Sequence, residues 1–152
     1  MSSHKQIAVD TNIIMDAVKA DGAADVAPDE LAAARGIGAL LLTANILVYS
    51  KKMEQEWTSK GLLGSNSNKL LLDLLRHERM KQVTPLRVSG GQARDLGQFV
   101  DPDDQPFVLV AAVIRDRPRL LITRDPKTVR DPSRRYVKKE FKVVVKKASE
   151  HV

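Results

Sequence analysis

The sequence contains no cysteine, few aromatic residues and no long hydrophobic run. The absence of cysteine excludes disulfides, thiolate metal sites and cysteine nucleophiles, and it is compatible with a reducing cytoplasm. Aromatic residues make up only 4% of the chain, so we expect a core of Leu, Val, Ile and Ala. The N-terminal residues 1–6 lead into a three-residue apolar run, which is not the pattern of a signal peptide. The longest uncharged stretch, 36–50, is too short and too polar to span a bilayer, so we expect a soluble, cytoplasmic protein without a membrane partner.

The net charge of +6 comes entirely from the C-terminal part of the chain. Residues 1–126 carry 16 basic and 16 acidic side chains, whereas the basic C-terminal segment 127–152 carries nine basic and three acidic ones. Such a cluster attracts phosphate backbones, although a solvated surface explains the same composition. The segment starts directly after Asp125 and Pro126, and this position favours nucleic-acid binding.

Strands and helices alternate along the chain, which predicts an α/β fold with a parallel sheet covered by helices on both faces. The chain shows no internal repeat and no linker, so 1–152 is expected to form a single domain. The apolar runs predict strands at 7–9, 46–49, 83–88, 120–123 and 141–145. The predicted helices cover 13–19, 28–42, 51–59, 69–80, 92–99 and 107–115, with a loop at Gly90 and Gly91.

Two acidic residues stand where predicted strands end. Asp10 follows the run 7–9, and Asp125 follows 120–123 after the single residue Arg124. Strand ends of this kind share one edge of an open parallel sheet, where such folds bind ligands. Each acid also has a structural explanation, because Asp10 can cap the next helix and Asp125 can begin a turn before Pro126. Their matching positions at two strand ends nevertheless indicate a shared site.

Two further acids are candidates for the same site. Asp104 lies in a turn with Asp101 and Asp103, and a helix N-terminus explains one or two acids there but not three. The apolar helix that follows would hold Asp104 firmly in place. Glu56 lies on the predicted helix 51–59, two residues from Glu54, so only one of the two glutamates is expected to face the cleft. The sequence leaves that choice open.

Converging carboxylates repel one another unless a cation joins them. Mg²⁺ prefers a few carboxylate ligands and keeps several waters, which can serve as nucleophiles in phosphodiester hydrolysis. The pattern therefore predicts a metal-dependent nuclease. An aspartyl-phosphate phosphotransferase would also use an acid after the first strand, but it normally needs a second acid two residues later, where this chain has Asn12.

Four short motifs resemble the PIN-domain ribonucleases in order and spacing. They are Val-Asp-Thr-Asn at 9–12, Ser-x₅-Glu with a following aromatic at 50–57, Asp-x-x-Asp-x-x-Phe at 101–107, and Leu-Ile-Thr-x-Asp at 121–125. The match covers nearly the whole chain and is most similar to small prokaryotic stand-alone PIN proteins, including toxins of VapBC-type toxin–antitoxin pairs. Two positions depart from the pattern, because Arg124 replaces a common Gly and Pro126 follows Asp125.

The resemblance implies a three-layer α/β/α fold and an endoribonuclease that binds Mg²⁺ or Mn²⁺. It implies RNA as substrate, an antitoxin protein as partner in the toxin case, and a homodimer. A PIN-like domain that binds RNA or protein without cutting is the alternative. Arg124 would contact a substrate phosphate, or pair with an acid and partly close the pocket. By resemblance the catalytic acids are Asp10, Glu56, Asp104 and Asp125, of which Asp10, Asp104 and Asp125 are metal ligands, with Asn12, Thr123 and Asp101 in support. The residues expected to bind RNA are Arg124, Lys127, Arg130, Arg134, Arg135, Lys138 and Lys139.

Overall fold

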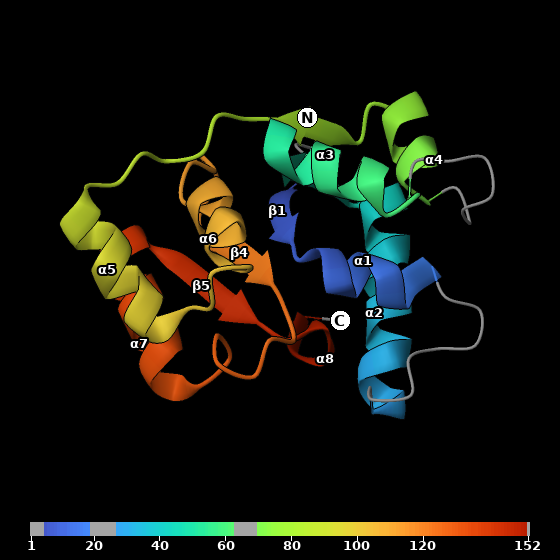
Figure 1. Cartoon of the computed structure of the whole chain (residues 1–152). Helices are drawn as coiled ribbons and strands as arrows, with labels where there is room; N and C mark the ends of the chain where they lie inside the picture. The colour runs from blue at the N-terminus through green and yellow to red at the C-terminus, as the bar shows by residue number, and fades with distance from the viewer. Residues whose placement is uncertain (1–4, 19–26, 63–69, 152) are drawn as a thin grey trace.

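A computed structural model describes residues 5–18, 27–62 and 70–151 of the chain. These residues form a five-stranded, fully parallel sheet with the strand order β3-β2-β1-β4-β5 (Figure 1). The predicted parallel α/β sheet is therefore confirmed, while the predictions for residues 1–4, Lys19 and Lys69 fall outside the described residues. The strands are β1 (Lys5–Val9), β2 (Asn45–Tyr49), β3 (Met80–Gln82), β4 (Arg119–Ile122) and β5 (Val143–Lys146).

Helices flank the sheet and complete the three-layer α/β/α architecture. In Figure 1, α5, α6 and α7 gather beside β4 and β5, whereas α1 to α4 lie on the other side of the molecule. None of the helices in the described ranges combines the length and the apolar character that crossing a bilayer requires. The helices are α1 (Thr11–Val18), α2 (Pro28–Thr43), α3 (Lys51–Ser59), α4 (Leu70–Arg76), α5 (Gly90–Phe99), α6 (Gln105–Ala111), α7 (Asp131–Phe141) and α8 (Ala148–His151).

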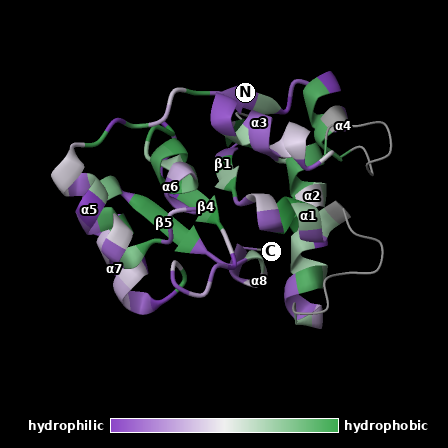
Figure 2. Cartoon of the chain, viewed as in Figure 1, coloured by the Kyte–Doolittle hydropathy of each residue, from purple (hydrophilic) through white to green (hydrophobic). Residues whose placement is uncertain are grey.

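The central strands are buried on both faces. In β1 the residues Ile7, Ala8 and Val9 are completely buried, and in β4 the run Leu120–Ile122 is at most 2% exposed. Such unbroken apolar runs are typical of parallel strands covered by helices. Figure 2 shows hydrophobic residues concentrated on β4, β5 and α6, while the visible side of α3 is largely hydrophilic. The central strands are thus firmly anchored, and so are the residues that directly follow them.

The strand order places a topological switch point between β1 and β4. From β1 the chain proceeds to β2 and β3 on one side and then returns to β4 and β5 on the other. Val9 pairs with Ile122 at the end of this central pair, and the Asp10 amide donates to the Ile122 carbonyl at 2.9 Å. Open parallel sheets bind their ligands in the crevice at such a point, outside the carboxyl ends of the strands.

Several predicted element boundaries in the middle of the chain are wrong. The helix predicted to reach residue 80 ends at Arg76, and Glu78 then adopts a left-handed conformation with φ of 55° before β3 begins at Met80. The strand predicted at 83–88 is therefore displaced to Met80–Gln82. Helix α5 includes the glycines expected to form a loop, because Ser89 and Gln92 form a reciprocal capping box at its start. Helix α6 ends at Ala111, earlier than predicted.

The basic C-terminal segment contains a helix, α7, that the sequence reading did not include. Its buried residues Ser133, Val137 and Phe141 recur every four positions and face the rest of the protein. Phe141, expected to start the last strand, instead ends α7. Lys142 then takes a left-handed conformation with φ of 58°, and β5 begins one residue later.

Candidate active site

A cleft of about 400 Å³ opens at the carboxyl edge of the sheet, where β1 and β4 end. All four predicted acids line it, although they come from four separate segments of the chain. Two lysines from α3 and its C-terminal end line it as well. The described residues that line it are Asp10, Asn12, Lys52, Glu56, Lys60, Pro102, Asp103, Asp104, Pro106, Phe107 and Asp125.

Asp10 is held rigidly at the base of this cleft. Its side chain is buried. Its Oδ1 accepts a hydrogen bond from the backbone N–H of Asn12 at 3.1 Å, and its Oδ2 accepts one from the Thr123 hydroxyl at 2.9 Å. Burial raises the pKa of Asp10, the two hydrogen bonds oppose that rise, and the charges of Glu56 and Asp125 add to it. Asp10 therefore makes the helix-capping contact expected of it through Oδ1, while its Oδ2 contacts the residue that follows β4.

Asp104 is a buried acid whose pKa is strongly raised. It stands directly before α6, is only 4% exposed, and its Oδ2 accepts the Thr128 hydroxyl at 2.8 Å. Burial, followed by repulsion from Asp10 and Asp125, raises the pKa of Asp104 to about 7. The folded protein therefore pays a free-energy cost to ionise this carboxyl at neutral pH, which a neighbouring cation would reduce.

Asp125 begins a turn and faces the cleft at the same time. Its Oδ1 accepts the amides of Lys127 and Thr128, both at 3.0 Å. Its own amide donates to the Thr123 hydroxyl oxygen at 3.2 Å. The Thr128 hydroxyl lies 3.2 Å from Asp125 Oδ1 as well as 2.8 Å from Asp104 Oδ2.

Two threonine hydroxyls consequently connect the three aspartates. Thr123 joins Asp10 to Asp125, and Thr128 joins Asp125 to Asp104. Both threonines are completely buried, so neither hydroxyl is free to turn away into solvent. Thr128 therefore holds the carboxylates of Asp104 and Asp125 together, and Thr123 ties the Asp10 carboxylate to the backbone at Asp125.

Of the two glutamates on α3, Glu56 lines the cleft and Glu54 does not. The Glu56 side chain is 39% exposed and lies 3.8 Å from Lys60 Nζ, a weak ion pair at the surface. Helix α3 is oriented by Trp57, whose indole N–H donates to the Thr11 hydroxyl at 3.1 Å. The orientation of α3 therefore brings Glu56, and not Glu54, to the cleft, a choice that the sequence left open.

The supporting residues are distributed unevenly around the cleft. Asn12 lines it, and Thr123 lies beneath it as the buried partner of Asp10. Asp101 is outside the lining and lies 3.8 Å from Lys127 Nζ, whereas its neighbour Asp103 lines the cleft instead.

Sequence reasoning missed Lys52, Lys60 and Thr128. The spacing of Lys52, Glu56 and Lys60, every fourth residue, was a usable signal because such residues share one helix face. Thr128 had a signal too, since an acid followed three residues later by Thr is typical of a turn closed by side-chain hydrogen bonds.

Arg124 pairs with an acid, which is one of the two roles expected for it. Its Nε donates to Asp16 Oδ2 at 2.7 Å, and the Asp16 side chain on α1 is only 1% exposed. Asp16 does not line the cleft, so this pair does not close it. Arg124, which stands where the PIN-domain pattern commonly has Gly, instead connects the end of β4 to α1.

The other basic residues expected to bind RNA are not gathered at the acidic cleft. Lys127 Nζ donates to the Gly97 carbonyl, and Arg134 donates to the Val129 carbonyl and pairs with Glu150 at 3.0 Å. Arg130 is exposed near the start of α7. Arg135, Lys138 and Lys139 line a different cavity. Helix α7 leads away from Asp125, so most of the basic segment lies apart from the acids, and its binding of RNA stays a prediction.

The donor set fits a hydrated divalent cation. Within the described residues, no group of three or more Asp, Glu or His side chains lies close enough together to hold a metal ion by itself. Mg²⁺, however, is commonly bound through one or two carboxylates and retains several waters. The acids at the switch point supply only oxygen donors, which suit Mg²⁺ or Mn²⁺ better than softer metals. A cation there would also offset the repulsion that raises the pKa of Asp104.

Comparisons of the chain with protein-family models, curated proteins and solved structures give no match. The resemblance to PIN-domain ribonucleases rests on the motifs around Asp10, Glu56, Asp104 and Asp125. All four of those acids line the cleft, together with Asp103.

Proposed function

We propose that this chain is a metal-dependent endoribonuclease that hydrolyses phosphodiester bonds of RNA in the acidic cleft. The convergence of Asp10, Asp104 and Asp125 at the switch point is the observation that carries the proposal. A purely structural role for these acids is unfavourable, because burial and, after it, the neighbouring carboxylates raise the pKa of both Asp10 and Asp104. Acids kept together at such a cost are typical of functional sites.

Asp10, Asp104 and Asp125 are the residues that would hold Mg²⁺ or Mn²⁺. When bound, the cation would supply the positive charge that activates water and stabilises the charge developing on the phosphate oxygens. Thr123 and Thr128 keep the carboxylates in a fixed arrangement, so little reorganisation is needed when substrate binds. No side chain has to form a covalent bond to the substrate.

The stripe of Lys52, Glu56 and Lys60 on α3 is proposed to position the RNA. The two lysines flank Glu56 on the cleft wall and carry the positive charge that a phosphate backbone needs in order to approach the five acids that line the cleft. Glu56 is half-buried and faces the same space, so it is placed to accept a proton from the attacking water.

The proposal extends to the partners that the resemblance implies. A toxin would be neutralised by a small antitoxin protein, whereas an RNA-processing nuclease would have no such partner. An adjacent gene for a small DNA-binding protein distinguishes the first role from the second. A homodimer is expected in either case, and light scattering measures it directly.

RNA cleavage by purified protein tests the proposal. Labelled RNAs are incubated with Mg²⁺, with Mn²⁺ or with EDTA, and the variants are Asp10→Asn, Asp104→Asn and the exposed control Asp95→Asn on α5. We expect cleavage that requires metal and is lost in the first two variants but retained in the control. Cleavage that survives in both Asp10→Asn and Asp104→Asn would exclude this site. If every RNA is bound but none is cut, the chain is a binding module.

A further inference from the structure

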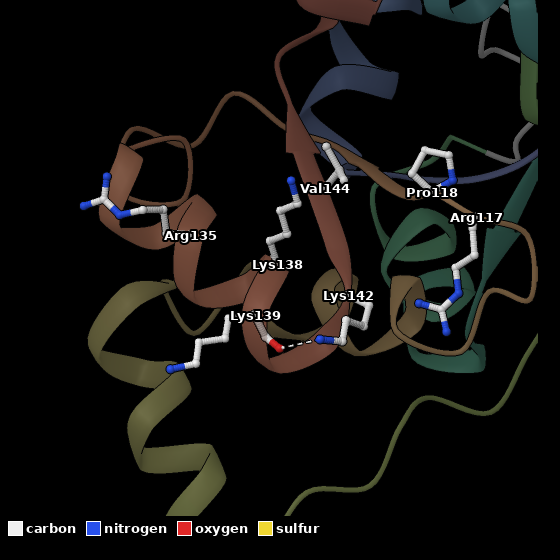
Figure 3. Close-up of a pocket in the computed structure, with 7 residues that line it drawn as sticks. All are labelled: Arg117, Pro118, Arg135, Lys138, Lys139, Lys142 and Val144. Atoms are coloured by element: carbon white, nitrogen blue, oxygen red, sulfur yellow. Dashed lines mark hydrogen bonds between the residues drawn. The ribbon is translucent and has the colours of Figure 1, made fainter.

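A second, strongly basic cavity of about 480 Å³ lies away from the acidic cleft. We call it the basic cleft, and the described residues that line it include five cationic side chains and no acidic one. In Figure 3, Arg117 and Pro118 stand on the loop across from the lysines at the end of α7. The lining consists of Arg117, Pro118, Arg135, Lys138, Lys139, Lys142 and Val144.

The basic cleft is at the opposite edge of the sheet from the acids. Arg117 and Pro118 come directly before β4, and Lys142 comes directly before β5. All five strands are parallel, so the starts of β4 and β5 share the amino edge, whereas Asp10 and Asp125 follow strand ends at the carboxyl edge. The four residues of β4 alone separate the two edges by roughly 13 Å.

Helix α7 joins the two edges. It connects the carboxyl end of β4 to the amino end of β5, and its 11 residues extend over about 16 Å. Arg130 is exposed just before its start, and Arg135, Lys138 and Lys139 are exposed along it, because Val137 and Phe141 turn the opposite face inward. The acids Asp131 and Glu140 lie on the same helix, but neither lines the basic cleft.

The chemistry of the basic cleft suits phosphate groups. The surface of the cavity itself is almost entirely aliphatic, formed by Pro118, Val144 and the stems of the cationic side chains, and the charged ends of Arg135 and Lys139 extend outward from it (Figure 3). The lining contains no aromatic side chain on which a base would stack, so recognition would depend on charge and not on base identity. The Lys142 amine is directed across the end of α7, where it donates to the Lys139 carbonyl at 3.4 Å (Figure 3).

We propose that the basic cleft binds the phosphate backbone of the same RNA that is cut in the acidic cleft. The RNA would follow α7 from one edge of the sheet to the other, so the substrate class is long or structured RNA and not short oligonucleotides. At the spacing of about 3.4 Å per base pair of duplex DNA, about five base pairs cover the length of α7, and the more compact A-form helix of RNA needs at least as many. The inference rests on the proposed nuclease function.

RNA binding measured in EDTA tests the inference separately from cleavage. Fluorescence anisotropy gives the affinity and its salt dependence for a long hairpin RNA and for an oligonucleotide too short to reach both clefts. The test variant is Arg135→Ala/Lys138→Ala/Lys139→Ala. The control Arg76→Ala/Lys81→Ala/Arg94→Ala removes the same charge from exposed positions on other elements. Circular dichroism and thermal unfolding verify that both variants are folded.

We expect the test variant to bind the hairpin about 10- to 100-fold more weakly and to reduce its salt slope by about 2, as the loss of three phosphate contacts implies. Binding of the short RNA should be affected equally in the test and control variants. With Mg²⁺ present, KM for the hairpin should rise while kcat stays near the wild-type value.

Equal hairpin affinities in the two variants would overturn the inference. Polyglutamate, as an acidic polypeptide, is titrated in the same way. The inference would also be overturned if the test variant still binds the hairpin but no longer binds polyglutamate, because the basic cleft would then be a surface for acidic protein segments. If no RNA is cut by the wild-type protein, the nuclease proposal fails, but the anisotropy comparison still reports on the basic cleft.

Discussion

Replacement of Asp104 by Asn is expected to stabilise the metal-free protein above neutral pH while removing the proposed nuclease activity. Burial and the charges of Asp10 and Asp125 raise the pKa of Asp104 to about 7. In the wild-type protein the Thr128 hydroxyl donates a hydrogen bond to Asp104 Oδ2 at 2.8 Å. An asparagine removes the charge but keeps a carbonyl oxygen that can accept this hydrogen bond. The variant should therefore lose the repulsion without losing the hydrogen bond.

The sign and size of the effect follow from proton linkage. Because the pKa of Asp104 is higher in the folded state than its ordinary value of 3.8, the free energy of unfolding falls as the pH rises between those two values. The full difference corresponds to an upper limit of about 4 kcal/mol, at about 1.4 kcal/mol per pKa unit. The three aspartates share the repulsion and their side chains relax, so we expect about 1–2 kcal/mol from Asp104→Asn at about pH 8.

Urea unfolding in EDTA at about pH 5 and about pH 8 measures this effect, with slopes compared to verify two-state behaviour. Asp103→Asn is the matched control, because Asp103 is exposed in the same turn and its replacement should change stability little at either pH. Asp104→Asn should raise the free energy of unfolding more at the higher pH than at the lower. A variant that is equally destabilised at both pH values would refute the reasoning and make Asp104 an ordinary structural residue.

Three further substitutions test other contacts. Arg124→Ala should lower the free energy of unfolding by about 3 kcal/mol, because the buried Asp16 carboxylate loses its partner, and an unchanged urea midpoint would contradict this. Glu56→Gln should reduce kcat by about 10- to 100-fold while Glu54→Gln leaves it near wild type, and the reverse order in a cleavage assay would reassign the glutamate. Thr128→Val should weaken Mn²⁺ binding by about 10-fold in a calorimetric titration, with recovery in Thr128→Ser; equal affinities in both variants would show that the hydroxyl does not position the acids.

The sequence predicted the central sheet and its acidic edge because both depend on local patterns. The runs before Asp10 and Asp125 are unbroken and apolar, which is typical of buried parallel strands. Strand ends in such a sheet must meet at one edge, so the proximity of these two acids followed without any further information. The crowding of acids before the apolar helix α6 located Asp104 in the same way.

The errors concern features that depend on tertiary contacts. Helix α7 was missed because its inward residues Val137 and Phe141 are few among many charges, and only packing against β5 makes the periodicity visible. The sequence shows that the basic segment follows Asp125, but not where the segment leads. A crossover helix in a parallel sheet must run back to the opposite edge, and this moves Lys138 and Lys139 away from the acids.

The orientation of individual side chains was equally out of reach. Glu56 and Glu54 were indistinguishable until α3 was fixed by the hydrogen bond between Trp57 and Thr11. The pairing of Arg124 with Asp16 joins residues far apart in sequence, and no local pattern indicates it.

A crystal structure of the protein soaked in Mn²⁺ tests the central claim most directly. The anomalous signal of manganese locates the ion without reference to activity. We predict a single strong peak in the acidic cleft, within coordination distance of carboxylate oxygens from Asp10, Asp104 or Asp125, that disappears in Asp10→Asn/Asp104→Asn. A cleft without a peak, or a peak that persists in the double variant, would contradict the assignment of these acids as a metal site.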